Sequence, residues 1–228
     1  MFNWMAKPAD QRPGRRPAAP PPDARAEQRI LDAAHAVFVR RGTAGARMQE
    51  IAEAARVNQA LLHYYFRSKD RLAEAVFRRA AMQLLPSVIG VLASAGELEE
   101  KVARVVELEL DHLLRTPGLP GYVISELSHH PDRARQLVSA LTGVTPENVR
   151  GRVFRTLRAQ IAERVRRGGM RPIAPEQFVV NLLSLCVFPF AARPMLEVML
   201  GLDRRRFARF VARRRKELAP FFLRALRP

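Results

Sequence analysis

Residues 47–69 limit the possible fold of this chain more than any other stretch. Apolar residues in the segment from Met48 to Ala55 recur with the spacing of one face of a short helix. A tight three-residue connection follows, in which we expect Val57 to be buried and Asn58 to cap a second short helix. The residues expected to face inward from that second helix are Leu61, Leu62 and Tyr65. This spacing predicts a helix-turn-helix.

The second helix of this motif would turn Gln59, Ala60, His63 and Tyr64 outward. Glutamine pairs bidentately with adenine, histidine reaches a base edge or a phosphate, and a tyrosine hydroxyl suits a phosphate. The pattern alone also fits two short helices that pack in an ordinary bundle. The residues around the motif distinguish between these two interpretations.

Those residues resemble the tetracycline-repressor (TetR) family of one-component regulators. The similarity begins at Arg29–Ala34 and is strongest at Ile51–Ala52 and along Leu62–Leu72. In the last of these segments an aromatic run ending in Phe66 precedes a Ser-Lys-x-x-Leu signature. Beyond about residue 80, only the helical pattern and the length of the chain agree with the family.

The resemblance implies an all-α fold with a three-helix DNA-binding head, a linking fourth helix, and a helical body that dimerises and holds an effector. The protein would be a homodimer that binds double-stranded operator DNA, acts as a repressor, and leaves the DNA when a small molecule binds. We expect a tail over 1–22, the helix-turn-helix domain over 23–69, and the effector-binding and dimerisation domain over 70–228.

The resemblance also implies roles for single residues. Tyr64 and Lys69 would grip phosphates, while Gln59, Ala60 and His63 would face bases. Lys69 stands at the start of a helix, where free backbone amides also favour an anion. The full predicted set of DNA-binding residues is Arg47, Asn58, Gln59, Ala60, His63, Tyr64 and Lys69.

Three positions depart from the family pattern. Ala46 stands where a capping Thr or Ser is common, and Arg47 is expected to contact phosphate instead. Arg56 replaces a frequent glycine of the turn, which costs about 1–2 kcal/mol if that residue is left-handed. His63 stands where tyrosine or tryptophan is common.

Helical periodicity continues to the end of the chain, without an alternating strand pattern. The first helix is expected over Ala24–Arg41, closed by Gly42, and the fourth is expected to begin after a Ser68 cap and to end or kink at Pro86. The later helices are expected at Glu97–Arg115, Leu119–His129, Pro131–Leu141, Pro146–Arg167, Pro175–Leu200 and Asp203–Leu226.

Two of these helices are expected to hold the dimer together. The helix from Pro146 has an apolar face and an arginine-rich outer face. The segment Phe178–Phe190, in the helix from Pro175, is apolar nearly all round, which predicts burial by its own domain and by a second subunit.

The effector site is expected between the fourth helix and the helices from Leu119 and Pro175. Polar groups inside an apolar run need partners, and a ligand is one candidate. Asn181 fits equally well as a residue that bonds across the core or the dimer interface. The predicted lining residues are Met82, Tyr122, Glu126, Asn181, Cys186 and Phe190.

Lysine and arginine number 39 against 22 acids, which gives a formal charge of +17 and favours an anionic partner. Most of this charge lies outside the head, in residues 150–172 and 203–228. Solvated faces, attraction to DNA, or an acidic effector such as an acyl-CoA or fatty acid would each account for it. The Pro-rich tail over 1–22 fits a passive disordered segment or a basic arm on DNA.

The remaining features argue against other classes of protein. A single cysteine, Cys186, excludes a disulfide framework and fits a reduced cytoplasm, and we find neither a signal sequence nor a membrane span. His129, His130 and Asp132 make a poor metal set, and no catalytic constellation or cofactor motif is present. The alternative that stays open is a peripheral membrane or interaction protein that uses the amphipathic segment Asp203–Leu226.

Overall fold

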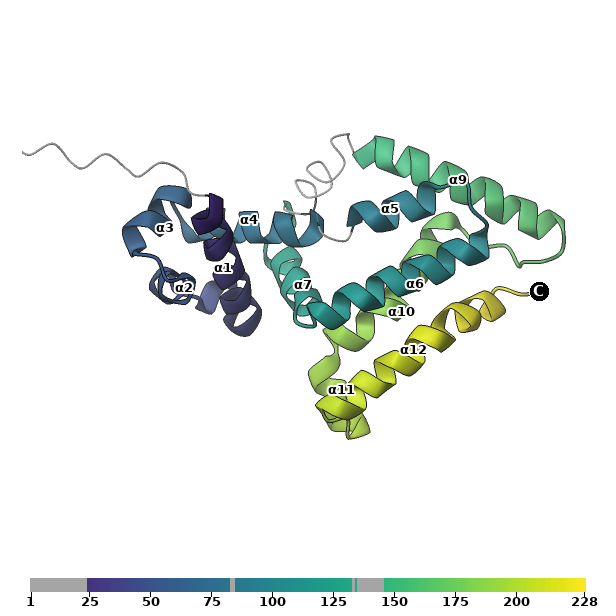
Figure 1. Ribbon diagram of the computed structural model, residues 1–228. Helices are drawn as coiled ribbons and strands as arrows, with labels where there is room; N and C mark the ends of the chain where they lie inside the picture. Colours follow the sequence, from purple (N-terminus) through teal and green to yellow (C-terminus); the bar gives the residue numbers. More distant parts are fainter. Residues whose placement is uncertain (1–23, 83–84, 133, 135–145) are drawn as a thin grey trace, which may run out of the picture.

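A computed structural model describes residues 24–82, 85–132, 134 and 146–228, and these residues form helices and no strand (Figure 1). The all-α fold is confirmed. The helices of the head and the linking helix are α1 (Ala24–Gly45), α2 (Met48–Ala55), α3 (Gln59–Tyr65) and α4 (Lys69–Met82). The helices of the body are α5 (Leu85–Ala93), α6 (Leu98–Arg115), α7 (Leu119–His129), α9 (Pro146–Arg166), α10 (Pro175–Ala191), α11 (Arg193–Leu200) and α12 (Arg204–Ala225).

The head has its own apolar core, built where α1 packs against α2 and α4. Ile30, Phe38, Ile51, Leu62 and Leu72 are fully buried there. Burying each such side chain contributes about 1.5–3 kcal/mol, which stabilises the two short helices α2 and α3 that would not be stable alone. The head therefore folds around the residues that the helical spacing of the sequence places inward.

Helix α1 is interrupted close to the predicted position. Gly42 has φ 69° and ψ 164°, a backbone conformation that favours glycine, and the chain resumes one short turn beyond it. The helix thus reaches Gly45 rather than ending before Gly42, and its last turn points in a new direction. This change of direction carries Thr43 against α7.

The body is organised around α6. Helices α5, α10 and α12 all pack on α6, and α9 packs on α5 and α10. The body core contains Val102, Val105 and Leu110 from α6, together with Leu157 of α9 and Leu182 of α10. Apolar residues three and four positions apart on α6 supply its buried face, as expected for an amphipathic helix.

Helix α7 joins the body to the head. It packs against α1 and α4 on one side and against α10 on the other. Tyr122 lies in the head core, where its ring stacks on Phe38 with 6.1 Å between ring centroids, and its hydroxyl donates to the Ala73 carbonyl oxygen at 3.3 Å. Figure 1 shows α7 beside α4 and at the end of α6.

The prediction of one continuous helix over Pro175–Leu200 is wrong. The chain bends by 71° between α10 and α11. Pro194 lacks the N–H that would bond to the Phe190 carbonyl of a continuing helix, so α10 ends and α11 starts with this proline in its first turn. By length and apolar composition, no single helix in the described part of the chain could span a membrane; only the bent pair α10 and α11 together passes that test.

A second proline, Pro189, lies inside α10 and is accommodated there by a contact from α12. Because Pro189 has no N–H, it leaves the Leu185 carbonyl without its usual helical donor. Arg214 of α12 supplies the missing donors: its Nε lies 3.0 Å and its Nη2 2.7 Å from the Leu185 carbonyl oxygen. The proline thus creates a backbone site that fixes α12 beside α10.

Two segments of the sequence prediction lie outside the described residues: the tail over 1–22 and most of the predicted helix Pro131–Leu141. Helix α5 was not predicted. Pro86, which we expected to end or kink α4, stands in the first turn of α5 instead.

Candidate nucleic-acid interface

The connection between α2 and α3 forms the predicted tight turn. Arg56 is left-handed, with φ 54° and ψ 46°, and its N–H points to the carbonyls of Ala52 and Glu53. Asn58 caps α3, since its Oδ1 accepts from the Leu61 N–H at 2.6 Å. Val57 packs against the head core but is only half-buried. The cap and the turn together fix the direction of α3 relative to α2.

The outward face of α3 carries the side chains that the sequence predicts there. Gln59, Ala60, His63 and Tyr64 are all exposed, Tyr64 by 47%. Leu62 holds the opposite face of α3 in the head core. Helix α3 lies at the end of the molecule away from the C-terminus (Figure 1). Such a face is free to enter a DNA groove.

The start of α2 differs from the sequence prediction by one residue. Arg47, not Ala46, occupies the capping position, and its side chain makes no capping hydrogen bond. Ala46 is buried in the head core. The amide groups in the first turn of α2 therefore lack a side-chain cap, and the exposed Arg47 stands beside them. Free helix amides and a guanidinium are both donors suited to a phosphate.

Lys69 has internal partners at the start of α4. Its Nζ donates to the carbonyl oxygens of Ala44, at 3.0 Å, and Ala46, at 3.2 Å. An ammonium has three N–H donors, so one remains for an outside acceptor. Ser68 caps α4 as predicted, its Oγ accepting from the Arg71 N–H at 3.2 Å. Lys69 thus ties the connection between α1 and α2 to α4.

Two further arginines, which are not among the predicted DNA contacts, flank α3. Arg56 stands in the turn before the helix and Arg67 just after it, and both are exposed. Neither side chain has a hydrogen bond or ion pair with the described residues. Their positions immediately before and after the outward helix were the signal that could have identified them.

The six residues predicted to line an effector site lie in three places: the junction of head and body, the body core and the surface. Tyr122 and Glu126 are buried at the junction of head and body, where Glu126 accepts a hydrogen bond from Thr43. Cys186 and Phe190 are buried in the body core. The two remaining residues, Met82 and Asn181, are exposed.

The body core contains a buried acid that was not predicted from the sequence. Glu109 of α6 is only 3% exposed, and its Oε2 has no hydrogen-bond partner among the described residues. Burial raises the pKa of this carboxyl to about 7. Burial, with a smaller contribution from the Glu109 carboxylate, raises the pKa of the Cys186 thiol to about 12. In the sequence, Glu109 could have been recognised as an acid at a position where the helical pattern places an apolar residue.

Comparison with known proteins agrees with this geometry. Residues 30–76 match the family model of bacterial regulatory proteins, tetR family. The chain is 32% identical to the HTH-type transcriptional repressor SCO4008 of Streptomyces coelicolor, over 59% of this chain and 70% of that protein. It is 26% identical to the HTH-type transcriptional repressor NicS of Pseudomonas putida, over 78% of this chain and 82% of that protein.

Solved structures share the fold. A transcriptional regulator of the TetR/AcrR family from Thermobifida fusca matches with a TM-score of 0.55 and 17% identity, over 90% of this chain and 100% of that one. The hemolysin II transcriptional regulator HlyIIR matches with a TM-score of 0.52 and 20% identity, over 89% and 97%. From the helix-turn-helix geometry and these matches, the chain is a member of the TetR family of bacterial transcriptional regulators.

Proposed function

We propose that this regulator is a homodimeric repressor that binds operator DNA through α3 of both heads and leaves the DNA when a small molecule binds in the body. The observation that carries the proposal is the outward face of α3, which presents Gln59, His63 and Tyr64 from a helix fixed by a side-chain cap and a buried inner face. The names of SCO4008 and NicS, both repressors, support repression rather than activation.

In the proposed complex α3 lies in the major groove, with Gln59, Ala60 and His63 toward the bases and Tyr64 toward a phosphate. Arg47 and Lys69 bind the phosphates on either side. Lys69 keeps its two carbonyl contacts and uses its third N–H, so binding needs no rearrangement of the α4 start. The Asn58 side chain acts as the cap that orients α3 rather than as a base contact.

The proposed dimer interface lies on α10 and α12. Both helices pack on α6 and leave between them a groove of about 570 Å³, lined in part by Leu185, Phe210 and Phe221. Phe221 is 54% exposed, and Val180 and Phe188 on α10 are 58% and 55% exposed. Exposed apolar side chains along two neighbouring helices are typical of a surface that a second subunit covers.

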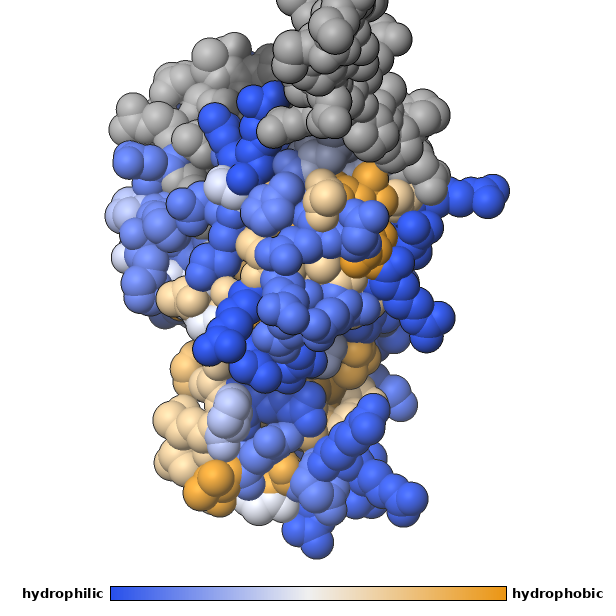
Figure 2. Space-filling view, turned by 90° about the vertical axis from the view of Figure 1, so that its left-hand side faces the viewer, coloured by the Kyte–Doolittle hydropathy of each residue, from blue (hydrophilic) through white to orange (hydrophobic). Residues whose placement is uncertain are grey.

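Helix α11 extends the same apolar surface. Its outer face carries Met195, Val198 and Met199, of which Val198 is 85% exposed. Figure 2 shows hydrophobic residues gathered at the lower edge of the molecule, the level at which α11 lies in Figure 1. The outward side of α9, in contrast, presents Arg155, Arg158 and other polar residues. We therefore assign the interface to α10, α11 and α12 and not to α9.

The effector is proposed to bind in the body near Glu109 and Cys186. A buried carboxyl oxygen without a partner is costly, and a ligand with a donor group there would remove that cost. Helix α7 then offers a route to the head, because it packs on α10 and holds α1 through the buried hydrogen bond from Thr43 to Glu126. Ligand and DNA must weaken each other by the same factor.

The experiment is to measure the affinity of single variants for the operator and for random DNA of equal length. Gln59→Ala and His63→Ala should reduce the ratio of operator to random affinity, at about 1–3 kcal/mol for a lost bidentate base contact. Tyr64→Phe and Lys69→Ala should weaken both affinities by similar factors. Ser87→Ala, an exposed change on α5, is the matched control. If Gln59→Ala and His63→Ala lower both affinities equally, α3 does not read the bases.

A further inference from the structure

The body contains a second cleft, far from α3 and outside the region proposed for the effector. It has a volume of about 400 Å³ and lies where the start of α6, the end of α9 and the end of α12 meet. The C-terminus next to it is at the opposite end of the molecule from the head (Figure 1). A volume of this size falls in the range of sites for small molecules.

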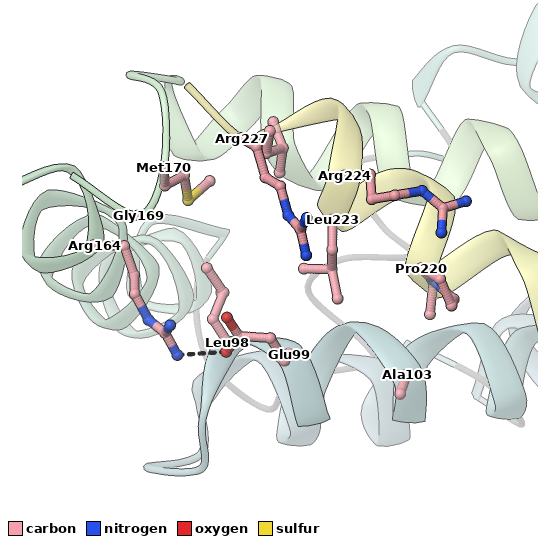
Figure 3. A pocket seen from close by; sticks show the side chains of 12 residues that line it. Leu98, Glu99, Ala103, Arg164, Gly169, Met170, Pro220, Leu223, Arg224 and Arg227 are labelled. Carbon is pink, nitrogen blue, oxygen red and sulfur yellow. Dashed lines mark hydrogen bonds and ion pairs between the residues drawn. The ribbon is translucent and has the colours of Figure 1, made fainter. Parts of the chain in front are cut away.

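The floor of this cleft is apolar. The lining includes Leu98 of α6, Met170 of the turn after α9, and Ala219, Leu223 and Leu226 near the end of α12. Figure 3 shows Leu223 pointing into the space between α12 and α6. A hydrogen bond from the Arg171 N–H to the Leu226 carbonyl oxygen, at 2.8 Å, holds this wall in place. Such a floor favours a ligand with a hydrocarbon part.

The rim of the cleft is cationic. Arg164, Arg224 and Arg227 line it, with Glu99 as the acid among the lining residues. Arg164 is paired with that acid, at 2.5 Å, and with Glu97, at 2.9 Å. Arg224 and Arg227 have no ion pair with the described residues, and Figure 3 shows the Arg227 guanidinium directed into the cleft. The Arg227 guanidinium, without a counter-charge among the described residues, thus stands over an apolar floor.

We propose that this cleft binds an amphipathic carboxylate. Its hydrocarbon part would cover Leu98, Met170 and Leu223, and its carboxylate would accept hydrogen bonds from Arg227. Guanidinium and carboxylate form strong bidentate pairs because their donor and acceptor geometries match. The proposal concerns binding alone and does not depend on whether an occupant changes the affinity for DNA.

The test uses decanoate and the full-length protein labelled with ¹³C in the methionine methyl groups. Met170 lies in the floor of the cleft, so its methyl resonance, assigned with Met170→Leu, should move as decanoate is added. Calorimetry on the same samples gives the affinity. Decyltrimethylammonium, with the same chain and the opposite charge, should bind at least tenfold more weakly.

Two variants locate the binding. Ala103→Trp should fill the cleft and abolish the Met170 shift, and because Ala103 is exposed this change should leave the fold intact. Arg227→Gln should weaken decanoate binding about tenfold. Arg204→Gln, an exposed arginine at the other end of α12, should leave the affinity unchanged. An unmoved Met170 resonance, or equal affinities of wild type and Ala103→Trp, would overturn the proposal, as would equal binding of the cation.

Discussion

The head and the body of this regulator are both built of helices, but they differ in where their polar side chains lie. On the DNA-binding face of the head, polar side chains either cap a helix, as Asn58 does, or face solvent from α3. The body keeps polar groups inside: Lys101 is buried and bonds to the Leu92 carbonyl and to Gln160, while Glu109 has an oxygen without a partner among the described residues. The head therefore fixes its DNA-binding face with its own residues, whereas the body has buried groups and apolar surfaces that a second molecule could satisfy.

The largest effect should come from removing the apolar surface that we assign to the dimer. The double variant Phe188→Glu and Phe221→Glu should be monomeric by light scattering and should bind the operator more than a hundredfold more weakly, because two linked heads gain affinity from each other. Ile124→Glu changes an equally exposed apolar residue outside α10–α12 and should remain dimeric. A monomeric double variant with full operator affinity would show that one head is sufficient.

The buried acid of the body gives a pH-dependent prediction. The pKa of Glu109 is about 7 in the folded protein, whereas its ordinary value is 4.5. Between pH 4.5 and 7 the folded chain therefore keeps a proton on Glu109 that the unfolded chain has lost. This contribution to stability therefore decreases as the pH rises from about 4.5 to 7.

Glu109→Gln should be more stable than the wild type at pH 8, by about 2–3 kcal/mol, and the gain should shrink at pH 5. The difference in the free energy of unfolding between variant and wild type is measured by urea unfolding at both pH values. The exposed Glu100→Gln on the same helix should show no such difference. A loss of stability at pH 8 would mean that the Glu109 carboxylate has a partner in solution.

A smaller effect concerns the contact between α12 and α10. Arg214→Met removes both donors to the Leu185 carbonyl and should destabilise the body by about 2 kcal/mol. Pro189→Ala restores the helical N–H, so adding it to Arg214→Met should recover most of the loss in urea unfolding. Arg213→Met, one residue away and exposed, should change the stability by less than about 0.5 kcal/mol. If the effects of Arg214→Met and Pro189→Ala on stability are additive, Arg214 does not compensate for the N–H that Pro189 lacks.

The sequence predicted the head better than the body because the head depends on local signals. Asn58, Ser68 and Gly42 act on backbone groups within a few residues, so their roles could be inferred from spacing. The bend at Ala192 and the Arg214 contact to α10 depend on residues from separate helices that meet only in the folded body. Periodicity places a residue on a face of its helix but does not say which helix covers that face.

The candidate sites follow the same division. The exposed positions on α3 could be predicted, because the motif fixes which side of a short helix is buried. For the residues predicted to line an effector site, the sequence could not show that Tyr122 and Glu126 pack toward the head while Cys186 lies in the body core. Arg227 gave no signal in the sequence, because only the packing of three helix ends makes the cleft that it enters.

The most direct test of the central claim is a footprint of the purified protein on the DNA that flanks its own gene. A pair of α3 helices should protect one near-palindromic site whose half-sites are about 34–36 Å apart, one turn of DNA, in the presence of excess random DNA. The same site should lose its protection when Gln59 and His63 are both replaced by alanine. Protection of a single unrepeated half-site, or protection that random DNA removes, would contradict the account of a dimer that reads its operator through α3.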